Sequence, residues 1–244
     1  MTTGSPTQKP KRFFKTVSIA QDETGWRVEL DGRTPKTPAK KSLVVPTKAL
    51  AAALATEWDS QKIELDLPRM TLTRLANVSI DRTPLTRPEM VAEVQKYGGT
   101  DLLCYLADNP AELRERQEAH FAPLRDWAGQ QHGVMLMTTQ GIINAPQPPA
   151  SIDAIGRYAD EKCDFGLTGL AMGLNIYGSA VLSMAVAEGE LSGPDAYDIS
   201  RIDEIWQIEQ WGEDAEAAAR TKDQRREAEA LGKWFEGLAS AAIA

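Results

Sequence analysis

The stretch FGLTGLAMGLNIYGSAVLSMAVA, residues 165–187, decides the fold of this 244-residue chain because it carries no charged residue. About 20 apolar residues suffice to span a bilayer. Here, however, interspersed glycines and hydroxyl side chains keep the stretch weakly apolar, and neither a bias of flanking basic residues nor an aromatic belt accompanies it. We therefore predict two helices buried in a helical core, with a break near Asn175–Gly178, and no stable membrane insertion.

The chain on both sides of this stretch also has helical spacing of apolar residues. Asn109-Pro110 predicts a cap followed by the first residue of a long helix that Gly133 ends. Ser151 is predicted to cap the next helix, and Gly193-Pro194 precedes another. We expect helices over residues 110–131, 151–163, 167–188, 194–220 and 222–240.

Residues 13–85 have a different pattern. The runs FFKTVSIA and GWRVELDG alternate partly between apolar and polar residues, and Asp31-Gly32 is a strong hairpin signal. Leu50, Leu54 and Trp58 then share one helical face, and helical spacing resumes over 70–81. The sequence predicts an α+β fold: a disordered arm over 1–12, a small N-terminal α/β domain over 13–85 and a larger, mainly helical domain over 86–244.

Composition and motifs argue against several function classes. A net charge of −8 without a basic stripe argues against nucleic acid as a partner. Cys104 and Cys163 lack motif spacing and are expected to be buried free thiols, and His120 and His132 have no spaced ligands around them. Glycine-rich phosphate or dinucleotide loops are missing. We therefore expect no metal, no cofactor and no enzymatic activity.

The most unusual stretch is WQIEQWGEDAE, residues 206–216. At 100° per residue, Trp206 and Trp211 lie about 140° apart on a helix, so one face cannot bury both. Glu209 lies in the middle of an apolar arc, where burial of a charge is costly. Either Glu209 pairs with an arginine of the next helix (Arg220, Arg225 or Arg226), or it lies in a partly open groove and faces a polypeptide partner.

The segments RFFKTVSI, GWRVELDGRTPKTP, TEWDSQ, TDLLCYLAD and DEIWQIEQWGED occur in an order and spacing that resemble a known family. They are similar to the chaperones that assemble the catalytic head of the F-type ATP synthase, and in particular to the member that escorts the α subunit. The resemblance covers roughly residues 11–220. One departure is Trp206, where the family is expected to have phenylalanine.

The resemblance implies a non-enzymatic chaperone that binds the unassembled α subunit and prevents its aggregation until β displaces it. The residues that it suggests for client contact are Trp58, Gln207, Glu209, Trp211, Gly212, Glu213 and Asp214. For Trp58, the amphipathic pattern by itself favours core packing. We expect the free chain to be monomeric, and cytoplasmic in a bacterium or in the mitochondrial matrix in a eukaryote.

Two other hypotheses stay open at the level of sequence. One is an enzyme with an inter-domain cleft that uses Glu209 as acid or base. The other is a helical scaffold for a partner unrelated to the ATP synthase.

Overall fold

The computed structural model describes residues 9–141, 143, 145–212 and 214–239. It is 64% helical with a small sheet region near the N-terminus, which confirms the predicted α+β class. The strands are β1 Val17–Asp22, β2 Gly25–Leu30, β3 Val44–Val45, β4 Tyr105–Leu106 and β5 Thr139–Gln140. The α-helices are α1 Lys48–Asp59, α2 Thr71–Asp81, α3 Arg87–Tyr97, α4 Ala111–His132, α5 Pro149–Glu161, α6 Asp164–Tyr177, α7 Ala180–Glu188, α8 Gly193–Ser200, α9 Ile202–Trp211 and α10 Ala215–Ala239. Short 3-10 turns are η1 Leu67–Arg69, η2 Thr83–Leu85, η3 Gly98–Thr100 and η4 Leu102–Cys104.

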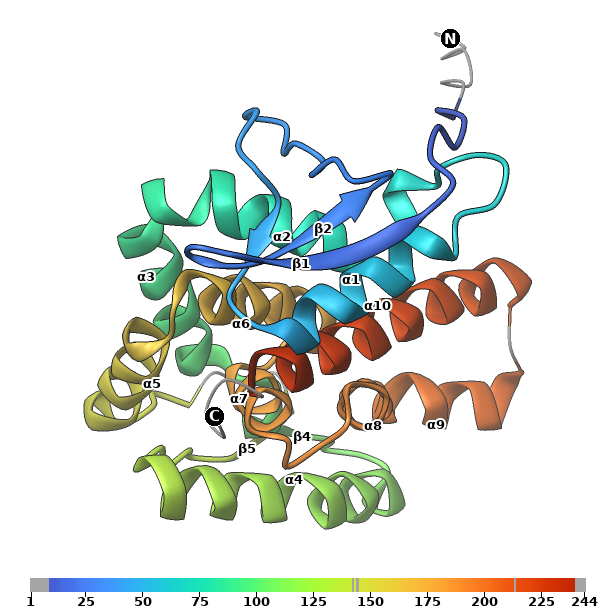
Figure 1. The fold of residues 1–244 in the computed structure, drawn as a ribbon. Helices are drawn as coiled ribbons and strands as arrows, with labels where there is room; N and C mark the ends of the chain where they lie inside the picture. The colour runs from blue at the N-terminus through green and yellow to red at the C-terminus, as the bar shows by residue number, and fades with distance from the viewer. Residues whose placement is uncertain (1–8, 142, 144, 213, 240–244) are drawn as a thin grey trace, which may run out of the picture.

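An antiparallel sheet of order β1-β2-β3 lies at one edge of the molecule, over α1 (Figure 1). Asp31 and Gly32 both have positive φ, at 49° and 75°, as the hairpin signal predicted. The Asp31 carboxylate accepts hydrogen bonds from the backbone N–H of Lys15 and Thr16. These bonds fix the chain just before β1 begins.

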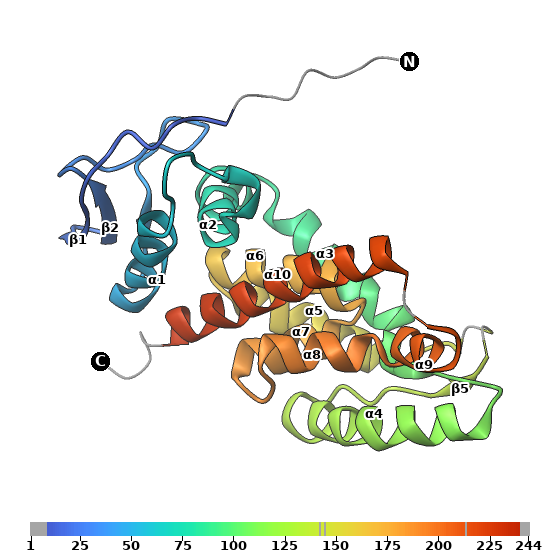
Figure 2. The same cartoon turned by 90° about the vertical axis from the view of Figure 1, so that its right-hand side faces the viewer.

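The charge-free stretch forms α6 and α7 at the centre of the molecule, as predicted (Figure 2). The break falls at Gly178 and Ser179, and the Ser179 hydroxyl accepts the Leu182 N–H at 3.0 Å to cap α7. Two glycines of α6 allow close packing. A Cβ at Gly169 would lie 2.6 Å from the Phe235 ring, and one at Gly173 would lie 2.5 Å from the Ser183 hydroxyl.

Asp101 supports the same central region and is fully buried. Its carboxylate accepts the Ser179 hydroxyl at 2.7 Å and the backbone N–H groups of Leu103 and Val181 at 3.0 and 3.1 Å. Burial raises the pKa of this carboxyl group, whereas the hydrogen bonds oppose the shift. Asp101 thus joins the start of α7 to the turn that precedes β4.

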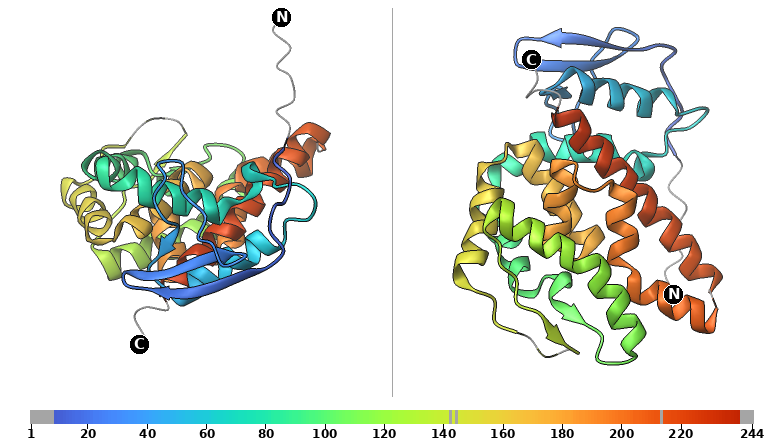
Figure 3. Two further views of the ribbon diagram at one scale, coloured as in Figure 1. Left: turned by 45° about the horizontal axis from the view of Figure 1, so that its top comes forward. Right: turned by 90° about the horizontal axis from the view of Figure 1, so that it is seen from below.

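Helix α10 crosses the whole molecule, from the neighbourhood of α9 to α1 and the sheet (Figure 3). Trp234 is fully buried, stacks on Phe165 at a centroid distance of 5.8 Å and donates its indole N–H to the Phe165 carbonyl. Near the end of α10, the Gly237 carbonyl accepts the Thr47 hydroxyl at 2.6 Å. One connected hydrophobic core runs from Phe14 to Phe235.

Several helix boundaries differ from the sequence prediction. The helix expected over 194–220 is divided into α8, α9 and the start of α10, at Arg201 and again after Trp211. Ser151 does not cap α5, because it lies inside that helix and its hydroxyl bonds the Met135 backbone instead. Pro110 itself occupies the cap position of α4, and no side chain caps that helix.

Strand β5 follows α4 in the chain and pairs in parallel with β4. Of the described helices, not one combines the length and the apolarity that crossing a membrane requires.

Candidate functional site: the α9 surface

Helix α9 packs one face on the protein and leaves its C-terminal end in solvent. Ile202 is buried, and Ile205, Trp206 and Ile208 are half-buried. The apolar arc predicted from the sequence is therefore real, but only its first residue is fully enclosed. A carboxylate at position 209 can lie beside this arc without being transferred into a dry core.

The two tryptophans have opposite environments, as the helical geometry predicted. Trp206 packs against the hydrophobic core, whereas Trp211, at the last position of α9, is 79% exposed. An exposed indole of this size is a large unsatisfied apolar surface, and tryptophan is the residue type most enriched in the energetic centres of protein interfaces. Trp211 is therefore the strongest contact candidate on this helix.

Glu209 pairs with Arg116 on α4. The Arg116 Nη1 lies 2.7 Å from the Glu209 Oε2, and the side chains are 34% and 47% exposed. Figure 2 shows α4 alongside α9 at the end of the molecule farthest from the sheet. Such a surface ion pair contributes about 0–1 kcal/mol to stability. It fastens α9 only weakly.

Of the two alternatives for Glu209, the pairing with an arginine of the following helix is wrong. Arg225 binds Asp198 of α8, with the Arg225 Nη2 2.8 Å from the carboxylate, and Arg226 binds Asp223. The actual partner, Arg116, lies 93 residues before Glu209. No local pattern in the sequence connects positions so far apart, and this is why the sequence did not indicate Arg116.

The other predicted contact residues of this region surround the end of α9. Gln207 and Asp214 are exposed. Gly212 ends the helix with φ 89° and ψ 165°, a combination that is open almost only to glycine. Glu213 lies outside the described residues.

Trp58 lies elsewhere, in the N-terminal part. It is 6% exposed at the end of α1 and meets the Phe14 ring edge-on at 5.8 Å. Its burial agrees with the core-packing alternative that the amphipathic pattern favoured. A role in client contact stays a prediction for Trp58, and it would require this side chain to leave its place in the core.

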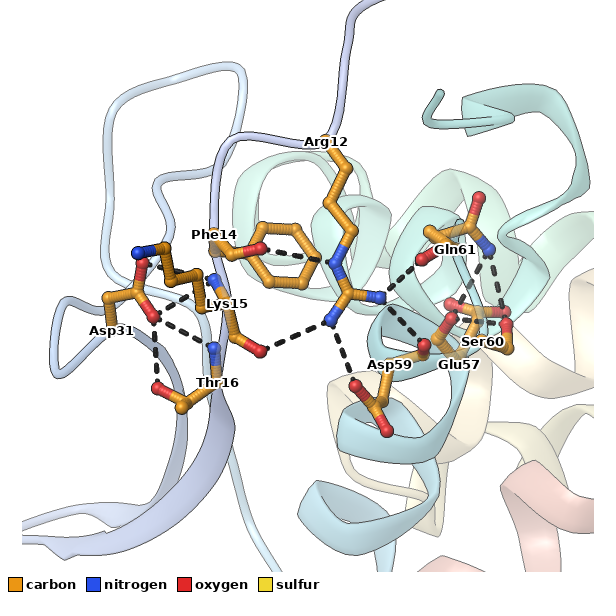
Figure 4. A network of polar contacts seen from close by, with 9 residues as sticks. All are labelled: Arg12, Phe14, Lys15, Thr16, Asp31, Glu57, Asp59, Ser60 and Gln61. Atoms are coloured by element: carbon orange, nitrogen blue, oxygen red, sulfur yellow. Dashed lines mark hydrogen bonds and ion pairs between the residues drawn. The ribbon is translucent and has the colours of Figure 1, made fainter. Parts of the chain in front are cut away.

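The TEWDSQ motif around Trp58 binds the segment that precedes β1 (Figure 4). The Arg12 guanidinium donates to the Phe14 carbonyl, to the Asp59 carbonyl and carboxylate, and to the Gln61 carbonyl. The Gln61 side-chain oxygen accepts the Asp66 N–H at 2.9 Å. These contacts join the segment before β1 to the end of α1, although Arg12 falls within the arm predicted over 1–12.

Glu57 of the same motif caps a different helix. Met70 precedes α2 and offers no side-chain acceptor, and the Glu57 carboxylate instead accepts the N–H groups of Leu72 and Thr73, each at 2.8 Å, together with the Thr73 hydroxyl. Burial raises the pKa of Glu57 despite these bonds. In the described structure, therefore, the motif has an architectural use.

Catalytic arrangements find little support in the described residues. A cavity of about 350 Å³ lies between α2, α3, α6 and α10, and none of its lining residues comes from α9. In the part of the chain that the structure describes, no three His, Cys, Asp or Glu side chains are grouped so that they could bind a metal ion. Glu209 is ion-paired on an open surface, which argues against its use as an acid or base in a cleft.

The fold and the α9 surface thus define a mainly helical α+β protein with an exposed apolar side chain at the end of α9. The family model described as ATP12 chaperone protein matches residues 11–129. The crystal structure of Atp12 from Paracoccus denitrificans is 37% identical, covers 93% of this chain and 97% of its own, and superposes with a TM-score of 0.86.

Two further relatives agree with this. The Atu1473 protein from Agrobacterium tumefaciens is 36% identical over 94% of this chain and 86% of its own, with a TM-score of 0.87. Mitochondrial Protein atp12 from Schizosaccharomyces pombe is 25% identical over 222 residues, or 85% of this chain and 76% of that protein. The chain belongs to the ATP12 chaperone family, a family of ATP synthase assembly chaperones and not of enzymes.

Proposed function

We propose that this chaperone binds the unassembled α subunit of the F-type ATP synthase and prevents its aggregation until the α subunit pairs with β. The observation that supports this client surface is the 79% exposed Trp211 at the end of α9, the helix that also carries Glu209. We assign client contact to this end of α9, including Gln207, Gly212, Glu213 and Asp214.

The chemistry of this surface suits a protein that must both hold and release its client. The indole supplies apolar contact area, and the acidic side chains around it limit non-specific association and keep the surface hydrated. Because no nucleotide-binding motif occurs in the sequence, we propose that β releases the client by competition for the same α-subunit surface. A cytoplasmic location in a bacterium is part of this proposal, and the similarity to two bacterial proteins supports it.

The test is capture of isolated α subunit by the purified chain. We expect the chain to suppress light scattering from aggregating α subunit and to co-purify with it, and added β subunit to reverse the capture. Trp211→Ala should weaken binding roughly thirtyfold or more, since loss of a central interface tryptophan costs about 2 kcal/mol or more. Its thermal midpoint should stay close to that of the wild-type chain.

Ile63→Ala is the matched control, because Ile63 is 81% exposed but lies in the N-terminal part. We expect this variant to bind as the wild type does. Glu209→Lys should weaken capture more than it lowers stability. Failure of the wild-type chain to bind α subunit would refute the proposal, and capture of a different protein would favour the scaffold hypothesis.

A further inference from the structure

Helix α9 depends on α4 for its direction. It begins after Arg201 and ends before Gly212, and α4 is the described element that it packs against most extensively. Of the residues of α9, only Ile202 is fully buried. Because so little of the helix is enclosed, the direction in which it points depends strongly on its individual contacts to α4.

One of these contacts comes from a buried amide on α4. Gln117 is 2% exposed. Its side-chain oxygen accepts the backbone N–H of Ala107, just after β4, at 2.6 Å, and its side-chain nitrogen donates to the carboxylate of Asp203 in the first turn of α9. Loss of either partner would leave a buried polar group unsatisfied, which is costly. Gln117 therefore joins α9 to the segment after β4.

The orientation of the Gln117 amide is fixed by its neighbours. A backbone N–H can only donate, so the N–H of Ala107 requires the amide oxygen, and the amide nitrogen must then face Asp203. An ionised carboxylate only accepts, which matches that nitrogen. Each group has one compatible role, and the link therefore specifies a single placement of Asp203.

The placement of Asp203 affects the far end of α9. Asp203 lies in the first turn, and Trp211 is the last residue of the same helix and is 79% exposed. Backbone hydrogen bonds join the successive turns of a helix, so a tilt or rotation at one end is carried to the other. The link between Gln117 and Asp203 thus sets the direction in which Trp211 is presented.

We propose that Gln117 is a positioning residue for client binding, which acts through Asp203 to hold α9 in the orientation that presents Trp211. This inference rests on the proposed function. Without the link, α9 adopts other orientations, and the client binds only the fraction of molecules in which the helix is correctly placed. Affinity falls although the buried Gln117 does not touch the client.

The experiment compares two substitutions of Asp203, which is exposed, so that the core stays intact. Asp203→Ala removes the acceptor and should raise the dissociation constant for isolated ATP synthase α subunit about three- to tenfold, the effect of losing one hydrogen bond. Asp203→Asn is the matched control. It removes the same charge but keeps an oxygen that accepts from Gln117, so its dissociation constant should stay within about twofold of the wild-type value.

Two further measurements separate positioning from direct contact. Amide hydrogen exchange over α9 should be faster in Asp203→Ala than in the wild type or in Asp203→Asn, with exchange in α6 and α7 unchanged. In a Trp211→Ala background, Asp203→Ala should have a smaller effect on client affinity, because the residue that the link positions is already lost.

Exchange of the donor and acceptor tests Gln117 itself. Gln117→Glu sets a carboxylate against Asp203 and should weaken client binding more than Asp203→Ala does. Adding Asp203→Asn restores the link in the opposite direction, because the new asparagine amide can donate to the new carboxylate. The dissociation constant should then return to near the wild-type value. If circular dichroism shows that Gln117→Glu does not fold, the comparison of the two Asp203 variants decides.

Wild-type affinity in Asp203→Ala would overturn the inference, and faster exchange over α9 without loss of affinity would show that the link only stabilises the helix. Equal weakening by Asp203→Ala and Asp203→Asn would overturn it too, because the charge of Asp203 would then contact the client directly. These outcomes require a wild-type chain that binds α subunit. Absence of binding by the wild-type chain would instead refute the proposed function, and the inference with it.

Discussion

Cys104 and Cys163 were expected to be buried alike, yet only Cys104 is buried. It is 1% exposed, and burial raises the pKa of its thiol to about 12. Because the thiolate is the reactive form, Cys104 should be inert at neutral pH in the folded protein. We predict that a thiol reagent labels one cysteine in the native chain and both after denaturation.

Cys163→Ser identifies the reactive site. This variant should show almost no native labelling, and Cys104→Ser should label as fast as the wild type. Rapid labelling of Cys104 in the native protein would mean that the 3-10 turn η4 opens far more often than a buried core segment does.

Glu57 gives a pH-dependent prediction. Its folded-state pKa is raised above the ordinary value of a glutamate, 4.5, chiefly by burial. Protonation therefore favours the folded state: the contribution is fully present below the unfolded pKa and is lost as the pH rises through the folded pKa. The difference in thermal midpoint between wild type and Glu57→Gln should shift in favour of the wild type as the pH falls from about 7 towards 5.

Glu190→Gln serves as the control, since Glu190 is exposed and its substitution removes the same charge. Its thermal midpoint should follow the wild type across the same pH range. A pH-independent difference between wild type and Glu57→Gln would show that the three hydrogen bonds to α2 balance the cost of burial.

Some side-chain environments were predictable because they follow from helix geometry alone. The angle between Trp206 and Trp211 required that one of them be exposed, and Trp211 is. The partner of Glu209 was not predictable, because Arg116 reaches it through the packing of two helices far apart in sequence. Local pattern determines which face of a helix is apolar, and tertiary packing determines what lies opposite the rest.

At the level of helices and strands, predictions succeeded where the sequence carries strong turn or helix-ending signals. The hairpin at Asp31-Gly32 and the break at Gly178 both have the backbone that their sequence signals require. The prediction of one continuous helix over 194–220 was wrong because Arg201 carries no helix-breaking signal. Gly212 did carry one, since glycine inside a helix is unfavourable and often marks its end, but the apolar arc around it outweighed that signal.

The end of α9 supports a prediction on Gly212. With φ 89° and ψ 165°, this residue lies where other residues cost about 1–3 kcal/mol. Gly212→Ala should lower the free energy of unfolding by about that amount in urea denaturation. Asparagine should give no relief, because its tolerance of positive φ is confined to the left-handed helical region.

Gly189 provides the comparison. It ends α7 with φ 77° and ψ 13°, inside the left-handed helical region. Gly189→Asn should therefore cost less than Gly189→Ala, whereas the two substitutions at Gly212 should cost the same. Rescue by asparagine at Gly212 would mean that the α9–α10 connection can relax into a left-handed helical turn, and that its observed backbone is not enforced.

On the scale of the whole molecule, the sequence indicated an N-terminal part with strands and a larger helical part, and it assigned α10 to the second. Helix α10 in fact contacts both. Arg69 and Arg74 of the N-terminal part pair with Asp223 and Glu227, at 3.2 and 2.9 Å, and Thr47 bonds Gly237. The sequence pattern predicted that α10 is a helix but not which elements it packs against. An apolar stripe indicates that a helix face is buried, and it does not indicate which surface buries it.

This placement predicts that the two parts unfold together. Trp234 of α10 is fully buried against the start of α6, and α10 also packs along α1. Trp234→Ala should lower the free energy of unfolding by about 3–5 kcal/mol, the usual cost of removing a core tryptophan. Loss of α10 packing exposes the sheet-bearing part and the helical part alike. Circular dichroism and tryptophan fluorescence should therefore report one shared transition in the wild type and in the variant, at a lower denaturant midpoint in the variant.

Leu85→Ala, at an exposed residue between α2 and α3, should leave that midpoint unchanged. Two separated transitions in the wild type would contradict the prediction, because they would show that each part folds without the support of α10.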